Sequence, residues 1–335
     1  MGREISISVP PAQPRRVRPR RLMRAAPASS FEAMSELGIL AFDLGGTDLK
    51  VARITGHGAV HGFTKVPSNA SQGEQALFAA ISHAASTVGY DGSPAWAGFG
   101  SPGVLHPVSG IIVDRTPNLA LPPDFPMRQR LETVLGKQVA IDNDANCAAL
   151  AEHTAGAAKG ARVSLTVTVG TGVGCGIVID GRVLKGSFGG AGEIGHLPLG
   201  STGPACGCGV AGCAEPMASG SGLVARAREA GLTVNNARDV FESNDPRAAA
   251  VIEQMIDHLA RMLGAATVLL NPDVIVLGGG VAQAGDKLFG PLRARTERYM
   301  LGSHRHHLRI VPAALGEQAG VIGAGLSAWQ AQTGA

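Results

Sequence analysis

Two stretches of the chain follow one pattern: Ile39-Leu-Ala-Phe-Asp-Leu-Gly-Gly-Thr-Asp-Leu-Lys-Val-Ala-Arg-Ile54 and Ser164-Leu-Thr-Val-Thr-Val-Gly-Thr-Gly-Val-Gly-Cys-Gly-Ile-Val-Ile179. Each predicts two strands joined across a Gly-Thr turn. Each then passes through a second turn, Thr55 to Gly58 in the first copy and Asp180-Gly181 in the second, into a third strand. Because the pattern returns after about 125 residues, it predicts two related half-molecules.

Strand and helix patterns alternate along the rest of the chain. Helices are expected near residues 73–88, 147–158 and 219–230, and strands at 95–99, 139–141, 274–277 and 308–311. A longer helix opens at Asp245 as N-cap, with Pro246 in its first position, and ends before Pro272. The last helix starts near Gln318. This alternation predicts an α/β fold.

The composition describes a protein with a large core. Of its 335 residues, 45% are hydrophobic and only 16% are charged, so the chain is long enough for two domains with a core each. The formal charge of +3 is located in one place, since residues 1–38 hold seven arginines against three glutamates. The body of the protein therefore gives no sign of nucleic-acid binding.

The first 37 residues combine arginine with proline and show no sustained apolar period, so we expect a disordered tail. A nucleic-acid arm or an organelle address is the alternative. Met34, shortly before the first strand, is a candidate for the natural start of translation. We find no secretory signal and no apolar run of the ~18 residues that a membrane span needs. The clustered cysteines suit a reducing compartment, so we expect a cytoplasmic, soluble protein.

One histidine and three cysteines gather in a glycine-rich stretch. His196, Cys206, Cys208 and Cys213 form the Cys₃His set of a closed, tetrahedral zinc site. A disulfide between Cys206 and Cys208 would be strained, because a single residue separates them. Reduced thiols in a loop are the alternative. A catalytic zinc is disfavoured, because four protein ligands leave no open position. The pattern therefore predicts a structural zinc ion.

Three glycine turns suggest a phosphate site. Asp43 ends a strand beside a glycine turn, where backbone N–H groups approach an anionic oxygen and a carboxylate holds a divalent cation or its water. Gly170-Thr-Gly172 repeats this arrangement, and Gly278 to Gly280 adds a third cluster. Together they predict one nucleotide held between two domains. Taken singly, each turn also fits a tight hairpin.

The run Asp142-Asn-Asp144 follows a strand and precedes a helix. A carboxylate at such a place can accept the proton of a substrate hydroxyl that attacks a γ-phosphoryl group. The same residues also make good helix N-caps. The spacing alone does not choose between the two roles.

In combination, four motifs resemble the ROK family of bacterial sugar kinases and repressors over residues 38–330. They are Asp43-Leu-Gly-Gly-Thr47 with Lys50, Asp142-Asn-Asp-Ala-Asn146, Gly192-Glu-Ile-Gly-His196 and Cys206-x-Cys-x₄-Cys213. The resemblance implies a two-domain actin-like, ribonuclease-H-like fold, usually a homodimer, in which ATP and sugar meet in the interdomain cleft. We expect an N-terminal domain at 38–145, a larger domain at 146–317, and a final helix at 318–333 that packs back on the first.

The resemblance also implies roles for single residues. Asp144 would be the general base. The sugar-binding residues would be Asn143, Asp144, Glu193, His196, Glu215 and, in a substrate loop, Asn118. The residues that contact ATP and Mg²⁺ would be Asp43, Gly45, Gly46, Thr47, Lys50, Thr171, Gly172 and Gly279. Zinc on His196 and Cys213 would fix the backbone that carries Glu193 and Glu215, since sugar recognition needs side chains held within about half an ångström.

The implied activity is phosphorylation of the 6-hydroxyl of a hexose by ATP, with glucose as the first hypothesis. An N-acetylhexosamine, another hexose or a glucose-like cyclitol is the alternative, and polyphosphate is an alternative donor. The walls of the sugar site, residues 100–103, 116–120 and 188–191, do not decide among these sugars. A sugar-responsive repressor is disfavoured, because some 38 residues before the first strand cannot supply a helix-turn-helix domain.

Overall fold

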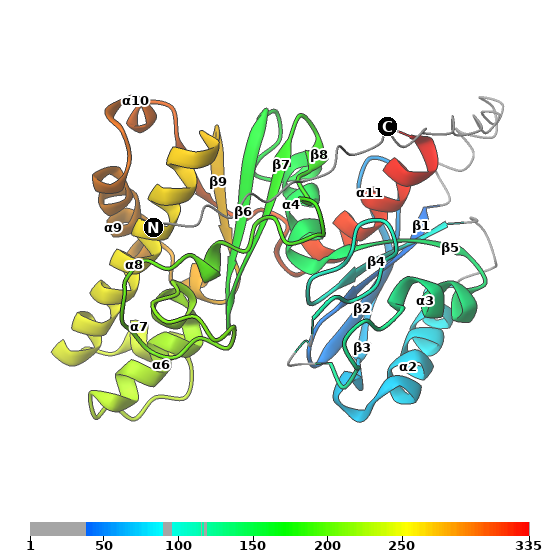
Figure 1. The fold of residues 1–335 in the computed structure, drawn as a ribbon, viewed down its shortest axis with the longest axis horizontal. Helices are drawn as coiled ribbons and strands as arrows, with labels where there is room; N and C mark the ends of the chain where they lie inside the picture. Colours follow the sequence, from blue (N-terminus) through cyan, green and yellow to red (C-terminus); the bar gives the residue numbers. More distant parts are fainter. Residues whose placement is uncertain (1–37, 90–95, 115, 117–118, 335) are drawn as a thin grey trace, which may run out of the picture.

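The structure, a computed structural model, describes residues 38–89, 96–114, 116 and 119–334. The predictions for the tail, for Met34 and for Asn118 fall outside these residues. Within them, ten strands form two five-stranded sheets that stand side by side (Figure 1). No helix in the described ranges combines the length and the apolar character needed to cross a membrane.

The two sheets share one topology. The first contains β1 (Ile39–Leu44), β2 (Asp48–Ile54), β3 (Val60–Pro67), β4 (Trp96–Ser101) and β5 (Gln138–Asn143), in the order β3-β2-β1-β4-β5. The second contains β6 (Val163–Val169), β7 (Val173–Ile179), β8 (Arg182–Val183), β9 (Val274–Gly278) and β10 (Arg309–Pro312), in the order β10-β9-β6-β7-β8. In both, three antiparallel strands are extended by two parallel ones. The predicted repeat and the α/β class are confirmed.

Helices cover the outer face of each sheet. On the first sheet lie α2 (Glu74–Thr87) and α3 (Met127–Leu135). The second carries α5 (Glu215–Ala218), α6 (Gly220–Glu229), α7 (Ala237–Glu242), α8 (Pro246–Leu270), α9 (Asp286–Thr296) and α10 (Gly302–Arg305) around its own apolar core. Short 3₁₀ turns are η1 (Ala70–Gln72), η2 (Ile194–His196), η3 (Val281–Ala284), η4 (Glu297–Tyr299) and η5 (Gly316–Gln318). Each sheet thus has one covered face and one that meets the middle of the molecule.

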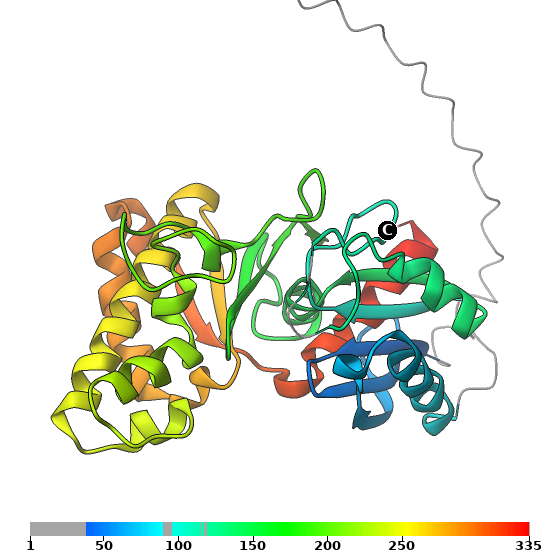
Figure 2. The same ribbon diagram turned by 60° about the horizontal axis from the view of Figure 1, so that its bottom comes forward.

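Two helices fill that middle, α4 (Asp144–Ala155) and α11 (Ala319–Thr333), as Figures 1 and 2 show. They are exchanged between the halves: α4 follows β5 but packs mainly on β6 and β7, whereas α11 follows β10 but packs on β1 and β4. They also pack on each other. This exchange agrees with a final helix that returns to the first sheet, while the domain boundaries themselves stay a prediction.

The differences from the expected elements are one shifted helix start and several helices that were not predicted. The alanine-rich helix begins at Asp144 rather than Cys147, because the Asn143 side chain accepts hydrogen bonds from the N–H groups of Ala145 and Asn146. The predicted start of α8 is confirmed, with Asp245 as N-cap and Pro246 in the first turn. Helices α3, α7 and α9 were not predicted, and α9 contains Pro291.

Glycine allows the two central helices to approach closely. A Cβ atom at Gly323 of α11 would overlap the backbone of Cys147 in α4. We therefore expect Gly323→Ala to lower the free energy of unfolding by about 3 kcal/mol, as overpacking of a core does, and the melting temperature by roughly 5–10 °C. Thermal denaturation of the purified variant measures this.

The control for this substitution is Gly302→Ala in α10. Gly302 is exposed, and a Cβ atom there meets nothing within 4 Å. Because alanine favours a helix over glycine by roughly 0.5–1 kcal/mol, this variant should melt at or slightly above the wild-type temperature. Equal melting of the Gly323→Ala variant and the wild type would contradict the close packing of α4 on α11.

Candidate active site

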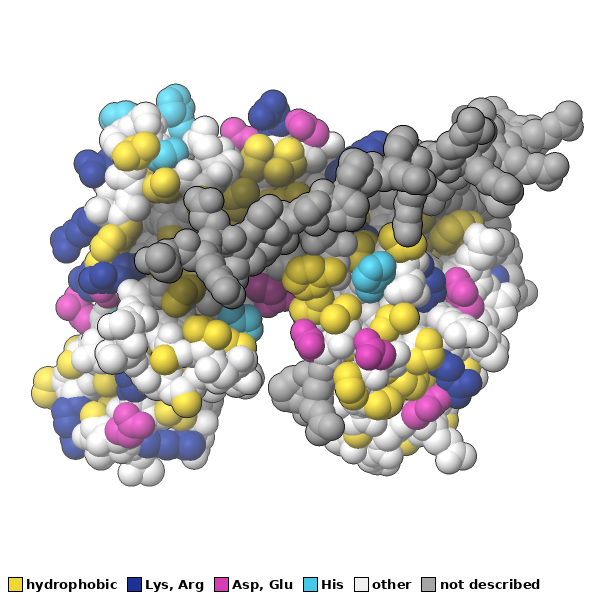
Figure 3. Space-filling model, viewed as in Figure 1, with side chains coloured by type: hydrophobic (Ala, Val, Ile, Leu, Met, Phe, Trp, Pro, Cys, Tyr) yellow, Lys and Arg dark blue, Asp and Glu magenta, His cyan; other side chains and the backbone are white. Residues whose placement is uncertain are grey.

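A pocket of about 540 Å³ lies between the two halves of the molecule. The space-filling view shows a deep notch between them (Figure 3). Three predicted residues of the first half-molecule and of α4 line the pocket, Asp43, Lys50 and Asp144. Across from them it is lined by Gly278–Gly280 and by Thr168 of the second sheet. The pocket is therefore shared by both sheets.

Asp43 and Lys50 form an ion pair at the pocket wall. They are opposite each other in the β1–β2 ladder, and Lys50 Nζ lies 2.9 Å from Asp43 Oδ2. Asp43 is buried, with its residue only 8% exposed. A buried carboxylate beside one cation keeps a negative charge available inside the pocket, which suits a divalent cation or the water bound to it.

Asp144 opens α4 and also lines the pocket. The pKa of its carboxyl is raised to about 7, mainly by removal from water and also by the negative charges of Asp43 and Glu193, while hydrogen bonds from the backbone N–H groups of Ala145 and Asp144 act in the opposite direction. A carboxyl with a pKa near neutrality can exchange a proton at physiological pH. Its neighbour Asn143 is the N-cap of α4 and donates its amide N–H to Gly103 O at 3.1 Å, so the capping role weighed for this run belongs to Asn143.

The first two glycine turns are both tight hairpins, and they stand beside the pocket rather than in its lining. Gly45 N donates to Asp48 O at 2.8 Å, and Gly170 N donates to Gly172 O at 3.0 Å. The third turn touches the second, because a Cβ atom at Gly279 would overlap the backbone of Val169. Of the glycines predicted to contact a nucleotide, Gly279 lines the pocket, whereas Gly45, Gly46 and Gly172, like Thr47 and Thr171, do not.

Glu215 joins the cysteine segment to the second glycine turn. Its Oε2 accepts the N–H of Val173 at 2.9 Å, directly after that turn. Partial burial raises the pKa of the Glu193 carboxyl, His196 lowers it and Glu215 raises it. Glu193 Oε2 lies 3.9 Å from His196 Nε2. The predicted sugar-binding side chains Glu193, His196 and Glu215 thus form one group, and Glu193 lies close enough to Asp144 to raise the pKa of its carboxyl.

The side chains of His196, Cys206, Cys208 and Cys213 converge, with one ligand atom from each within 4.8 Å of every other. Cys206 Sγ lies 3.4 Å from His196 Nδ1 and from Cys208 Sγ, and Cys208 Sγ lies 3.5 Å from Cys213 Sγ. Donors bonded to one zinc ion at about 2.3 Å stand roughly 3.8 Å apart in a tetrahedron. The four residues therefore fit a zinc ion, and all five cysteines of the chain are free of disulfides.

One of the predicted sugar-site walls, residues 188–191, packs close to another. A Cβ atom at Gly189 would overlap the backbone of Leu105, so the segment 188–191 packs against the loop that follows residues 100–103. Phe188 is 54% exposed. The third wall is formed by residues 116–120. Two of them, residues 117 and 118, lie outside the described residues, so the prediction for Asn118 is not tested.

Sequence reasoning singled out the run that contains Asp142 but missed the ion pair that this residue forms, and it missed Glu152 altogether. Asp142 pairs with Lys185, 2.7 Å away on the other half of the molecule, and its Oδ1 accepts the amide N–H of Asn146. Glu152 is fully buried on α4 and lines the pocket. The signal for Glu152 was a lone charge inside an alanine-rich helical run, but two of its three partners, Ala314 and Leu315, lie about 160 residues further along the chain.

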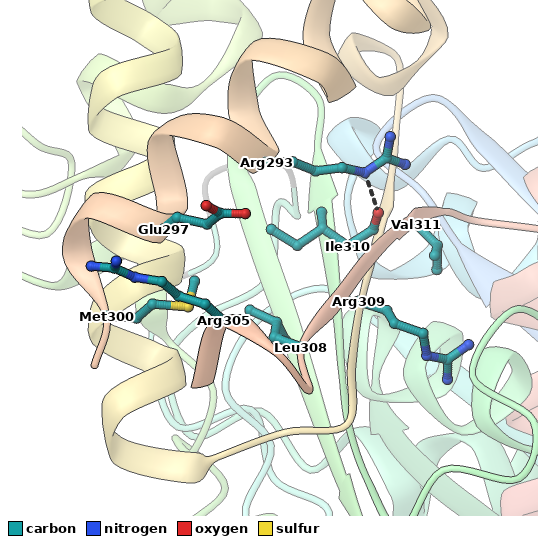
Figure 4. A pocket seen from close by; sticks show the side chains of 8 residues that line it. All are labelled: Arg293, Glu297, Met300, Arg305, Leu308, Arg309, Ile310 and Val311. Carbon is teal, nitrogen blue, oxygen red and sulfur yellow. Dashed lines mark hydrogen bonds between the residues drawn. The ribbon is translucent and has the colours of Figure 1, made fainter. Parts of the chain in front are cut away.

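A second hollow, of about 330 Å³, lies away from these residues, between α9, η4 and β10. Its floor is apolar, and its arginines point in different directions rather than toward a common centre (Figure 4). Arg293 is already engaged, since its Nε donates to Ile310 O at 2.8 Å. This hollow therefore lacks the converging polar groups that line the pocket between the two halves.

The chain matches the model of the ROK family over residues 39–331. It is 37% identical over 317 residues to a glucokinase of Halalkalibacterium halodurans, covering 87% of this chain and 95% of that one. Among solved structures it resembles a ROK hexokinase from Thermus thermophilus, with a TM-score of 0.79 and 35% identity over 89% of this chain and 99% of that one.

A second solved structure is a ROK family glucokinase from Streptomyces griseus in complex with glucose and AMPPNP. The TM-score is 0.76 and the identity 28%, covering 87% of this chain and 99% of that one. The family match, the topology of the two sheets and the placement of the motifs on both sides of one pocket agree. The chain belongs to the ROK family, whose actin-like ATPase fold it has.

Proposed function

We propose that this protein is a sugar kinase that transfers the γ-phosphoryl group of ATP to the 6-hydroxyl of glucose. One observation carries the proposal: a carboxyl with a pKa of about 7, Asp144, lies on the same pocket as the Asp43–Lys50 pair and the Gly278–Gly280 turn. The glucokinase relative and the neighbour that holds glucose and AMPPNP, an analogue of ATP, support glucose as the acceptor.

In this proposal Asp144 takes the proton of the sugar hydroxyl as that oxygen attacks the γ-phosphorus. The bond from the γ-phosphorus to the bridging oxygen breaks, and ADP leaves with the electron pair. Phosphoryl transfer depends mainly on positioning and on neutralising charge. Asp43 would hold Mg²⁺ or its water, and Lys50 with the turns at Gly45–Thr47, Thr171-Gly172 and Gly279 would face the phosphates.

The sugar would be bound by side chains that carry charge or a hydrogen-bonding nitrogen. Glu193 and Glu215 offer carboxylates, and Asn143 offers its amide. His196 offers Nε2, because its Nδ1 faces the cysteines. Asn118, outside the described residues, stays a prediction. Zinc on His196 and the three cysteines would bind no substrate itself but would fix the segment that carries both glutamates. A homodimer and a cytoplasmic location are parts of the same proposal.

The proposal is tested by a coupled ADP-release assay over glucose, other hexoses, N-acetylhexosamines and cyclitols. ATP serves as the donor in that assay, polyphosphate is tested as a donor by direct detection of the sugar phosphate, and reactions without sugar serve as the control. We expect the highest kcat/KM with glucose and ATP. A higher kcat/KM for an N-acetylhexosamine or a cyclitol would mean that this compound, and not glucose, is the substrate of the kinase. No sugar-dependent ADP release with any acceptor would contradict the kinase.

A further inference from the structure

The chain passes between the two sheets at two places in the described residues. The first crossing, residues 156–162, leads from α4 to β6, and the second, residues 313–318, leads from β10 to α11. Both crossings lie at the ends of the two central helices (Figures 1 and 2). Any change in the angle between the sheets must therefore be taken up at these two crossings, at the junction of β5 with α4, or in the helices themselves.

One carboxylate binds both crossings. Glu152 Oε2 accepts the N–H of Ala157 in the first crossing at 2.8 Å. Its Oε1 accepts the N–H groups of Ala314 and Leu315 in the second crossing, each at 2.9 Å. The residue is fully buried, with 0% exposure. Hydrogen bonds to a buried ionised acceptor are among the stronger ones in proteins, so Glu152 ties the two segments together.

The local sequence leaves room for this carboxylate. A Cβ atom at Gly156 would overlap Glu152 Oε2. Glycine at position 156 thus leaves the space that the Glu152 carboxylate needs to reach Ala157. This steric reason holds whatever the backbone angles of Gly156 are. A larger residue at position 156 would therefore displace the Glu152 carboxylate without replacing it.

The same residue also borders the proposed nucleotide site. Asp144, Ala148 and Glu152 follow each other at intervals of four along α4, and all three line the pocket. Opposite them the pocket is lined by Gly278–Gly280, which belongs to the other sheet, and by Gly316 of the second crossing. A shift at the crossings would therefore change the separation between Asp144 and the turn that faces the nucleotide.

We propose that Glu152 is a positioning residue that ties the two interdomain crossings into one hinge, and so sets the closure that brings Asp144 to the phosphoryl group. The inference rests on the proposed function, because the closure of the two halves serves phosphoryl transfer. Glu152 itself touches no reacting atom. It acts through the backbone of Ala157, Ala314 and Leu315.

Two variants release the hinge by different routes. In Glu152→Gln the amide oxygen can still accept from one crossing, but the NH₂ group then faces an N–H donor of the other. In Gly156→Ala the carboxylate remains and is displaced. We expect both to lower kcat by roughly 10- to 100-fold, as misplacement of a catalytic group does, while the glucose dissociation constant changes by less than about 3-fold. Lys159→Ala, an exposed residue of the first crossing, is the control and should behave as wild type.

Small-angle X-ray scattering measures how much the protein compacts when ligands bind. This compaction should not change in the variants if Glu152 only stabilises the fold. The wild type and Lys159→Ala should compact on addition of glucose and AMPPNP, and the two hinge variants should compact less. Variants that melt at a lower temperature but keep the wild-type kcat and compaction would overturn the proposal and leave Glu152 a packing residue.

A ligand-free measurement keeps the hinge testable if no sugar is phosphorylated or a variant folds poorly. In native-state hydrogen exchange of the wild type, the amides of Ala157, Ala314 and Leu315 should open together. In Glu152→Gln the exchange of Ala157 should separate from that of Ala314 by roughly 10-fold, the loss of one charge-assisted hydrogen bond. Independent exchange of the two crossings in the wild type would contradict the hinge, whatever the outcome for the kinase.

Discussion

Asp144→Asn is expected to lower kcat by roughly 10²- to 10⁴-fold, the usual contribution of a general base. The side chain keeps its size and can still accept the N–H of Ala145, which Asp144 Oδ1 accepts at 2.8 Å. The start of α4 should therefore be preserved, and the dissociation constant for glucose should change by less than about 3-fold. Steady-state kinetics and isothermal titration with glucose measure the two quantities.

The pH dependence of the wild type provides a second test of the same residue. Because the pKa of Asp144 is raised to about 7, the carboxyl is protonated, and unable to accept a proton, at lower pH. The logarithm of kcat/KM should rise with pH at a slope of one and level off above about 7. Near-normal turnover of the asparagine variant, or a wild-type profile that is flat between pH 5 and 8, would remove Asp144 from the base role.

A raised pKa also has a consequence for stability, whose direction can be derived. The folded state binds the proton of Asp144 more tightly than the unfolded chain, whose carboxyl has the ordinary pKa of 3.8. The folded state is therefore favoured at acidic pH, and this contribution is lost as pH rises through about 7. Asp144→Asn should melt a few degrees above the wild type at pH 8, by roughly 2 °C or more, and the difference should shrink toward pH 4.

A matched control separates this effect from a general change of charge. Asp180 lies in the exposed turn between β7 and β8 with a positive φ of 49°, a conformation that asparagine also tolerates. Asp180→Asn should therefore leave both the melting temperature and its pH dependence close to those of the wild type. A variant at Asp144 that melts lower than the wild type at every pH would show that its carboxylate supports the fold.

The features that the sequence predicted well are those set by local chemistry. The two Gly-Thr turns mark hairpins in both halves, because glycine closes such turns readily. Asp245 and Pro246 define the start of α8 through a cap and a fixed backbone angle. The cysteine spacing predicted four side chains that converge in space. In each case the deciding residues lie within about twenty positions of one another, so their pattern can be recognised in the sequence alone.

The features that were missed depend on partners far along the chain. Nothing near Glu152 indicates that its acceptors will meet Ala314, because that contact exists only after both sheets and α11 are in place. The ion pair of Asp142 with Lys185 likewise forms between the two halves. Helix α9 was missed for a local reason, since Pro291 normally breaks a helix interior. Here the helix continues with its apolar residues Leu288, Phe289 and Leu292 buried in the core of the second sheet, and this packing outweighs the lost hydrogen bond.

Loss of one cysteine of the cluster is the other change from which we expect a large effect. Cys208 is the exposed member of the four, so replacing it by serine leaves the core intact while removing a thiolate ligand. Bound metal should fall from about one zinc per chain to well below one. The melting temperature should fall by roughly 5–10 °C, since metal binding is coupled to folding of its loop. Elemental analysis and thermal denaturation measure these changes.

The effect on catalysis should show how the metal acts. If zinc only fixes the segment between Glu193 and Glu215, the KM for glucose should rise by roughly 10-fold or more, as it does when binding side chains lose their support, and the pH profile set by Asp144 should be unchanged. Val210→Ala, at an exposed position of the same loop, is the control and should keep its zinc and its KM. Wild-type protein without zinc would contradict the structural site. A shifted pH profile in Cys208→Ser would instead mean that the metal acts on the base, because a cation closer to Asp144 would change the pKa of its carboxyl.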